Sequence, residues 1–295
     1  MSGGEAYGSW EANSFNNRWV FRLSSLGCRL LPKSALYTIS DSLMDWFQGV
    51  RPGTLDAVED NLAKAYPGRG RPEVEALSSG TFLSYGRGVV DYLKSEHHPP
   101  IVTPRDGAIR IIRSLQGGAV LVTAHMGNWE VGGAYLGEIV GPHWMVGFPE
   151  KDSGVEAFRR RKRGSSGHTT VSAGMGLEGM LRLRGILEKG GRMVVLVDRS
   201  VGRDSVAVTF LGRKSNFLRS PAVFSTMTGA PIVPVAIMCD GPGRYSAYVS
   251  EPFRTSDCGG RPEAAMQRAA DFFSGILERY PDQWYNFFRY WREEP

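Results

Sequence analysis

The sequence predicts an α/β fold, with a mostly parallel central sheet flanked by helices and an N-terminal helical layer. Residues 119–123 are apolar or β-branched and lie between glycines, which is typical of a strand buried on both faces of a parallel sheet. Residues 192–197 form a second apolar run of this kind. Segments with helical spacing of apolar residues lie before and between these runs, and such alternation is typical of parallel sheets.

The composition is that of a globular protein. The chain has 295 residues, of which 42% are hydrophobic and 22% charged, so it is long enough for a sizeable core. We expect residues 1–15, rich in Gly, Ser and Asn, to be a disordered tail. We expect residues 16–100 to form the helical region and residues 101–295 the α/β core, with 16–295 as one compact domain.

Residues 19–39 are the most membrane-like stretch of the chain. Arg22, Arg29 and Lys33 interrupt it well before the roughly 20 apolar residues that a membrane span needs, so no transmembrane helix is predicted. It also lacks the apolar core of a signal peptide. The leucines between residues 23 and 31 have helical spacing, which fits either a helix in the membrane interface or one packed on the protein's own core.

The remaining elements follow from periodicity and turn residues. In chain order they are helical pieces at 55–62, 72–80 and 82–93, a strand at 143–148, a short basic helix at 155–163, a strand at 169–172, a helix ending near 187, a strand at 205–211, a basic loop at 213–219, a helix from 220, strands at 231–238 and 244–249, and a long helix at 262–280.

The first buried strand ends abruptly at a histidine. Gly127 breaks the apolar run, Asn128 is a favourable helix cap, and Glu130 falls in the first helical turn, where a carboxylate suits the positive end of the helix. The segment therefore predicts strand, tight turn and helix. His125 is placed at the carboxyl end of the strand, the edge at which open α/β sheets usually carry their chemistry.

Two carboxylates are candidates to orient His125. Glu130 would point about 140° away from it on one continuous helix, given roughly 100° per residue, but across a turn the two side chains can converge. Asp198 ends the second buried strand and reaches the same sheet edge if the strands are parallel. A carboxylate on one ring nitrogen makes the other more basic, so a general base is predicted. The simpler interpretation is a histidine that merely ends the strand.

Four stretches in order resemble one family. Residues 125–130 (HMGNWE) resemble its HxxNWE motif, and 194–212 resemble its strand ending in Asp with the "PFFGR"-like strand that follows. Residues 220–236 resemble its helix, Gly-Ala-Pro turn and strand, and 280–289 (YPDQWYNFFR) are similar to its aromatic close. The family is that of the bacterial lipid A lauroyl/myristoyl acyltransferases, which includes phosphatidylinositol mannoside acyltransferases.

The resemblance implies a glycerol-3-phosphate acyltransferase-like fold and an acyltransferase activity. The donor would be acyl carrier protein or acyl-coenzyme A, and the acceptor a hydroxyl of a lipid or glycolipid. His125, Glu130 and Asp198 would be catalytic, with neighbouring amides and cations stabilising the oxyanion and no Ser or Cys nucleophile, metal or cofactor. We expect a peripheral protein on the membrane surface, at the cytoplasmic side of the bacterial inner membrane.

Five residues are candidate substrate contacts. Arg160 and Arg163 belong to a run of adjacent cations at 159–163 that is suited to phosphate, although such runs are commonly solvated faces. Arg199 can contact an anion or pair internally with Asp198 or Asp204. The other two candidates are Asn128, which lies in the turn, and Ser220, which begins a helix whose free amides suit an anion.

Two other functions are compatible with the sequence. Residues 174–179 fit GxGxxG and are followed about 20 residues later by Asp198, as in nicotinamide- or flavin-dependent oxidoreductases. A non-catalytic lipid-binding protein is the second alternative, favoured if His125 is buried away from any opening. The net charge of +5 favours acidic partners, and we expect no nucleic-acid partner. The three cysteines have no metal spacing and suggest a reducing compartment.

Overall fold

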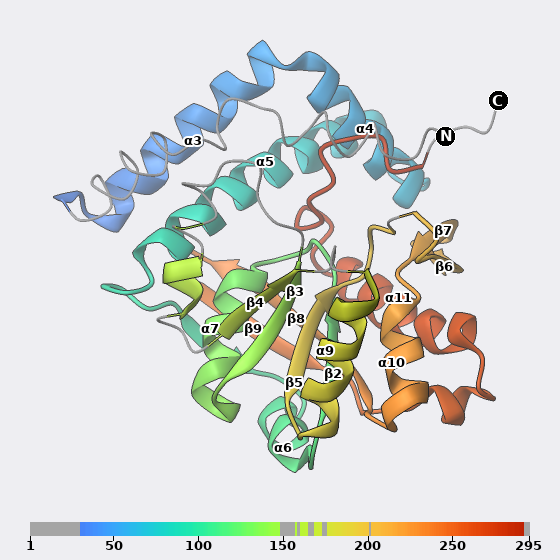
Figure 1. The fold of residues 1–295 in the computed structure, drawn as a ribbon. Helices are drawn as coiled ribbons and strands as arrows, with labels where there is room; N and C mark the ends of the chain where they lie inside the picture. The colour runs from blue at the N-terminus through green and yellow to red at the C-terminus, as the bar shows by residue number, and fades with distance from the viewer. Residues whose placement is uncertain are drawn as a thin grey trace.

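The computed structural model describes residues 30–147, 157, 160–164, 168–172, 176–200 and 202–291 (Figure 1). The expected tail at 1–15 and the leucine-rich stretch before residue 30 lie outside this part. The helices are α3 (Lys33–Val50), α4 (Pro52–Ala65), α5 (Arg71–Lys94), α6 (Ala108–Ser114), α7 (Trp129–Val140), α9 (Gly176–Glu188), α10 (Ser220–Thr228), α11 (Pro262–Leu277) and the 3₁₀ turn Thr255–Cys258.

The predicted α/β architecture is confirmed. A seven-stranded sheet has the order β1-β9-β8-β2-β5-β3-β4, and all its neighbouring pairs are parallel except the hairpin β8/β9. The strands are β1 (Ile101–Pro104), β2 (Ala119–Thr123), β3 (His143–Gly147), β4 (His168–Ser172), β5 (Arg192–Leu196), β8 (Ile232–Gly241) and β9 (Arg244–Val249).

Strand β2 lies at the centre of the sheet, between β8 and β5. All five of its side chains are buried, as the apolar run predicted. Val120 and Val122 pack with α9, α10 and α11 on one face, whereas Ala119 and Leu121 pack with α6 and α7 on the other. Because β2 and β5 pair in parallel, their carboxyl ends lie side by side.

Helices α3, α4 and α5 form the N-terminal layer, shown in blue and teal in Figure 1. The sequence predicted separate pieces at 72–80 and 82–93, but α5 is one helix of 24 residues. Gly80 does not end it, because Val74, Phe82 and neighbouring side chains pack into one continuous cluster along the helix. Of the helices in the described part of the chain, none combines the length and hydropathy needed to cross a bilayer.

A buried carboxylate joins this layer to the sheet. Asp91 of α5 is only 1% exposed and forms an ion pair with Lys33 of α3, at 2.5 Å. The hydroxyls of Tyr37 in α3 and Tyr245 in β9 also donate to it, both at 2.6 Å. Helices α3 and α5 and strand β9 are therefore held by one charge-assisted network.

A second prediction, for residues 213–219, is also wrong. Residues 213–219 were expected to be a basic loop, but Arg213–Phe217 form strand β7, which pairs antiparallel with β6 (Val206–Phe210). The polar pattern hid the strand because only Ser215 and Phe217 face the interior, while their neighbours remain exposed. Both Leu211 and Gly212 adopt positive φ, +50° and +74°, which closes the hairpin in two residues.

A contact between helices gives a test of this packing. A β-carbon at Gly86 would lie 2.6 Å from Ser40 Oγ and 2.8 Å from Met44 Cγ. Gly86→Ala is therefore expected to lower the free energy of unfolding by about 1 to 3 kcal/mol. Gly275→Ala is the matched control. A β-carbon added there would have no atom within 4 Å apart from its chain neighbours and its own helix backbone, so the free energy of unfolding is expected to rise by about 0.4 to 1 kcal/mol. Urea unfolding measures both, and equal effects would contradict the close approach of α3 and α5.

Candidate active site

A tight turn after β2 carries His125. Gly127 in this turn has φ +56°, and a β-carbon there would lie 1.9 Å from the Ile237 carbonyl oxygen. Only glycine fits, because the backbone of β8 approaches so closely that the Asn128 amide donates to the same carbonyl at 2.8 Å. The predicted strand, turn and helix are thus confirmed, and β8 holds the turn from one side.

The C-terminal segment holds the turn from the other side. The Gly127 amide donates to the Gln283 carbonyl at 2.9 Å, and the Tyr285 amide donates to the His125 carbonyl at 2.7 Å. Met126 and Trp284 form an isolated antiparallel bridge between these two bonds. The turn is therefore fixed by backbone bonds on both sides, so the ring of His125 leaves it in a defined direction.

Asp198, at the end of β5, is the carboxylate bonded to the histidine. His125 Nδ1 lies 2.7 Å from Asp198 Oδ1, and the His125 backbone amide donates to the same oxygen at 3.0 Å. The carboxylate is fully buried. Burial alone would raise its pKa, but the contacts with His125 and the charge of Arg199 outweigh burial and hold the pKa of Asp198 well below its ordinary value.

The surroundings of His125 favour its neutral form. Burial lowers its pKa below the ordinary value and the charge of Arg199 lowers it further, against the opposing effect of Asp198. Its Nδ1 atom faces Asp198, so Nε2 is the ring nitrogen left for a substrate, and 21% of the side chain remains exposed. A neutral imidazole oriented by a carboxylate, with its other nitrogen accessible, can remove a proton.

The aromatic close of the chain supplies the remaining ligands of Asp198. Trp284 Nε1 and Asn286 Nδ2 approach Asp198 Oδ2 at 3.3 and 3.4 Å, and the Tyr290 hydroxyl donates to the Asp198 carbonyl at 2.7 Å. From the sequence, this segment was identified only by its resemblance to the family's aromatic close, and its role at the carboxylate was missed. The signal was present in the family-like motif at 280–289.

Glu130 has a different partner. Its carboxylate receives two bonds from Arg163, at 2.5 and 3.1 Å, and Arg163 also donates to Thr170 at 3.3 Å. Of the two carboxylates that the sequence left open, Asp198 is therefore bonded to His125, while Glu130 holds an arginine from the basic run. Residues 160–164 are helical, and Arg160 is exposed there. Lys162 is buried against Glu96 and the Tyr92 ring.

Asn128 and Ser220 serve the fold. Asn128 caps α7 by accepting the Val131 amide at 3.2 Å, and its side-chain nitrogen donates to the Gly88 carbonyl and the Tyr245 hydroxyl. The helix amides expected to be free at Ser220 are occupied, because Asp204 accepts from Arg219 and Ser220 at 3.0 and 2.8 Å. An internal carboxylate therefore occupies the two amides at which an external anion was expected.

The amides of the turn are occupied as well. Those of His125, Gly127 and Asn128 bond to Asp198, Gln283 and Ile237, and that of Met126 bonds to Ala124. The sequence suggested that neighbouring amides stabilise an oxyanion, but these amides already have partners. Arg199 is likewise engaged by the C-terminal segment: it donates to Asn286 Oδ1 at 2.9 Å and to the Tyr285 carbonyl at 2.6 Å.

The dinucleotide-binding alternative loses its acidic residue. Asp198 is buried against His125 and cannot reach a ribose, and β3 lies between β4 and β5, which would have to be neighbours in that motif. Residues 174 and 175 of the glycine motif lie outside the described residues. In the described part of the chain, no three His, Cys, Asp or Glu side chains converge as metal ligands.

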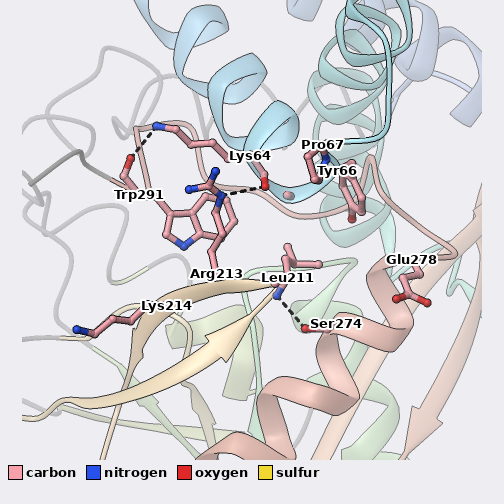
Figure 2. Close-up of a pocket in the computed structure, with 11 residues that line it drawn as sticks. Lys64, Tyr66, Pro67, Leu211, Arg213, Lys214, Ser274, Glu278 and Trp291 are labelled. Carbon is pink, nitrogen blue, oxygen red and sulfur yellow. Dashed lines mark hydrogen bonds between the residues drawn. The ribbon is translucent and has the colours of Figure 1, made fainter.

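A cavity of about 820 Å³ lies away from His125, between the end of α4, the β6/β7 hairpin and α11 (Figure 2). Lys64, Tyr66, Arg213 and Trp291 are among its lining residues, but neither His125 nor Asp198 is. Trp291 packs on Trp284, whose ring nitrogen points to Asp198. The cavity is therefore separated from the His125–Asp198 pair by an aromatic layer.

Comparison with known proteins identifies the family. Residues 13–293 match the family described as bacterial lipid A biosynthesis acyltransferase. The phosphatidylinositol mannoside acyltransferase of Mycobacterium tuberculosis (strain ATCC 25618 / H37Rv) is 24% identical over 281 residues, which cover 90% of this chain and 86% of the relative. That of Mycolicibacterium smegmatis (strain ATCC 700084 / mc(2)155) is 29% identical over 171 residues, covering 57% and 55%.

A solved structure is also similar. The 1-acyl-sn-glycerophosphate acyltransferase PlsC from Thermotoga maritima matches with a TM-score of 0.45 at 12% sequence identity, covering 86% of this chain and 100% of that one. The family match extends over nearly the whole sequence and includes strands β2 and β5 together with His125 and Asp198, which follow them. This chain belongs to the bacterial lipid A biosynthesis acyltransferase family.

Proposed function

We propose that this lipid acyltransferase moves a fatty acyl chain from a thioester donor to a hydroxyl of a lipid or glycolipid, with His125 as the general base. The observation that carries the proposal is the 2.7 Å contact between His125 Nδ1 and Asp198 in a ring that is still 21% exposed. The buried carboxylate fixes the tautomer, so that Nε2 is an acceptor facing the substrate side.

The proposed reaction uses this geometry. His125 Nε2 takes the proton of the acceptor hydroxyl while its oxygen attacks the thioester carbonyl, forming a C–O bond and a tetrahedral oxyanion. Collapse of this intermediate breaks the C–S bond, and the imidazolium returns its proton to the departing thiolate. General-base assistance supplies about 10² to 10⁴ in rate, so positioning and electrostatic stabilisation have to contribute the rest.

The substrates are inferred from chemistry and from the relatives. We propose acyl carrier protein or acyl-coenzyme A as donor, because both present a phosphorylated arm to a basic protein, of net charge +5. Arg163, oriented by Glu130 and 14% exposed, is the preferred phosphate contact, with Arg160 as the second candidate. The names of the relatives favour a glycolipid acceptor related to phosphatidylinositol mannosides.

We also propose peripheral attachment at the cytoplasmic side of the inner membrane, where a lipid acceptor would be met. Exposed apolar side chains on α3 support this location: Ile39, Leu43 and Val50 are 54%, 39% and 48% exposed. They recur at helical spacing on one face, which suits a membrane interface.

Removing the base gives the first test. His125→Ala is expected to reduce thioester consumption by about 10² to 10⁴, with acyl-coenzyme A or acyl carrier protein as donor and a membrane lipid extract as acceptor. His98→Ala, at an exposed histidine, is the matched control and should retain activity. Full turnover by the His125 variant would refute the proposed mechanism, and mass spectrometry of the lipids identifies the acceptor.

The pH dependence has a defined sign. Because burial and Arg199 lower the pKa of His125, the ring stays neutral below its ordinary pKa of about 6.5. The acid limb of kcat/KM against pH should therefore have its midpoint below about 6.5 and be flat from there to about pH 8. A midpoint at or above 6.5 would contradict the neutral, buried base.

The carboxylate gives a third test. Asp198→Asn is expected to lower kcat by about 10³ to 10⁴, because an amide that donates to Nδ1 selects the wrong tautomer. Asp45→Asn, on an exposed position of α3, is the control and should leave the rate unchanged. The measurement is kcat for thioester consumption by both folded variants. A decrease of less than tenfold in Asp198→Asn would exclude the orienting role of Asp198.

A further inference from the structure

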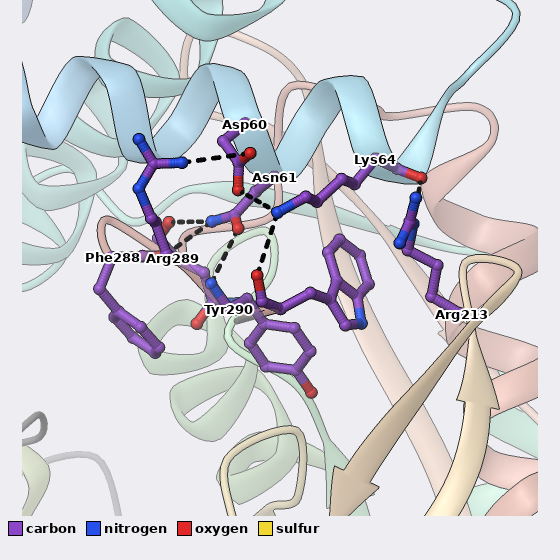
Figure 3. A network of polar contacts seen from close by, with 9 residues as sticks. Asp60, Asn61, Lys64, Arg213, Phe288, Arg289 and Tyr290 are labelled. Atoms are coloured by element: carbon purple, nitrogen blue, oxygen red, sulfur yellow. Dashed lines mark hydrogen bonds and ion pairs between the residues drawn. The ribbon is translucent and has the colours of Figure 1, made fainter. Parts of the chain in front are cut away.

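The last described residues cross the surface of α4, where three neighbouring side chains hold them (Figure 3). Asp60 pairs with Arg289 at 3.2 Å, and Lys64 donates to the Trp291 carbonyl at 3.1 Å. Between them, Asn61 is bonded to the backbone of residues 286–290. A helix of the N-terminal layer thus fixes a segment more than 200 positions away in the chain.

Asn61 uses both ends of its amide. Its nitrogen donates to the carbonyls of Asn286 and Phe288, at 2.9 and 2.7 Å, and its oxygen accepts the Tyr290 amide at 2.8 Å. The residue is 2% exposed, so water cannot replace these bonds. A buried amide satisfied by three backbone groups fixes the path of residues 286–290 more firmly than a partly exposed ion pair can.

The same residues reach the His125–Asp198 pair. Asn286, whose carbonyl is held by Asn61, directs its side chain to Asp198 Oδ2 at 3.4 Å and to Arg199 Nε at 2.9 Å. Tyr290, whose amide is held by Asn61, donates its hydroxyl to the Asp198 carbonyl at 2.7 Å. Each end of the segment fixed by Asn61 therefore carries a contact to the carboxylate residue.

We propose that Asn61 is a positioning residue for acyl transfer: through residues 286–290 it holds Asp198 and Arg199 in the arrangement that orients His125. The inference rests on the proposed function for its effect on turnover. Asn61 thereby connects helix α4 to the carboxylate that orients His125, and its bonds go to the C-terminal segment.

The inference predicts a specific change on removing the amide. Without Asn61, the carbonyls of Asn286 and Phe288 and the amide of Tyr290 lose their partner, and the segment has to rearrange toward water. Asp198 and Arg199 are the charged groups that act on the His125 ring. Admission of water and displacement of Arg199 both raise the pKa of His125 toward its ordinary value, while Asp198, which is bonded to the amide and to Nδ1 of His125, keeps its own raising effect.

The experiment compares three folded variants of the full chain. Asn61→Ala is the test. Tyr66→Phe is the control for a hydrogen bond lost between the N-terminal layer and the core, because the Tyr66 hydroxyl donates to the Leu277 carbonyl at 2.9 Å. Asp60→Asn is the control for the same segment, because it removes the ion pairs of Asp60 with Arg289 and Lys64 and leaves the Asn61 side chain unchanged.

Two quantities are measured. The first is the imidazole titration of His125 by NMR on histidine-labelled protein, whose five histidines are separated by assignment with His125→Ala. The second is kcat and KM for thioester consumption. Asn61→Ala is expected to raise the His125 pKa and lower kcat by about 10- to 100-fold with little change in KM for the donor, while both controls stay within about twofold of the parent.

Two results would overturn the inference: a folded Asn61→Ala whose His125 titration and kcat match those of Tyr66→Phe, or an equal effect of Asp60→Asn. If the alanine variant does not fold, Asn61→Ser, which keeps an oxygen for the Tyr290 amide, is judged by the same criteria. The titration needs no turnover, so it decides the role of Asn61 even if activity in His125→Ala disproves the proposed base.

Discussion

The fully buried carboxylate of Asp198 is the constraint on which the rest of the site depends. A charge without access to water is stable only if hydrogen bonds and neighbouring charges compensate for its lost hydration. Here His125 supplies both a backbone and a side-chain contact, and Trp284 and Asn286 face the second oxygen. The requirement to satisfy this one group brings together the ends of β2 and β5 and the close of the chain.

That requirement also explains the unusual importance of the C-terminal segment. It has no regular strand or helix around Tyr285, yet its backbone brackets the His125 turn and its side chains enclose Asp198. An irregular segment next to a buried charge needs its own polar groups satisfied. Helix α4 of the N-terminal layer meets this need, because Asn61 bonds to the backbone of residues 286–290. The N-terminal layer is thereby connected to the surroundings of His125.

The sequence-based errors have a common cause. Ser220 and the turn amides were expected to be free for an anion, but Asp204, Gln283 and Ile237 occupy them. Arg213–Phe217 looked like a basic loop because half of a hairpin strand faces water. In each case the local pattern correctly indicated a polar segment or the start of a helix. The partners of these polar groups come from other parts of the chain, so no local pattern predicts them.

Local sequence patterns were enough to predict the buried strand β2, the glycine turn, the Asn128 cap and the position of His125 at the carboxyl edge, because apolar periodicity, backbone freedom and capping act over a few residues. Which carboxylate contacts the histidine, in contrast, depends on how distant segments pack. Parallel pairing of β2 with β5 places Asp198 beside His125, whereas the start of α7 directs Glu130 to Arg163. Strand order and the path of residues 283–291 depend on contacts between distant segments, and no local pattern encodes them.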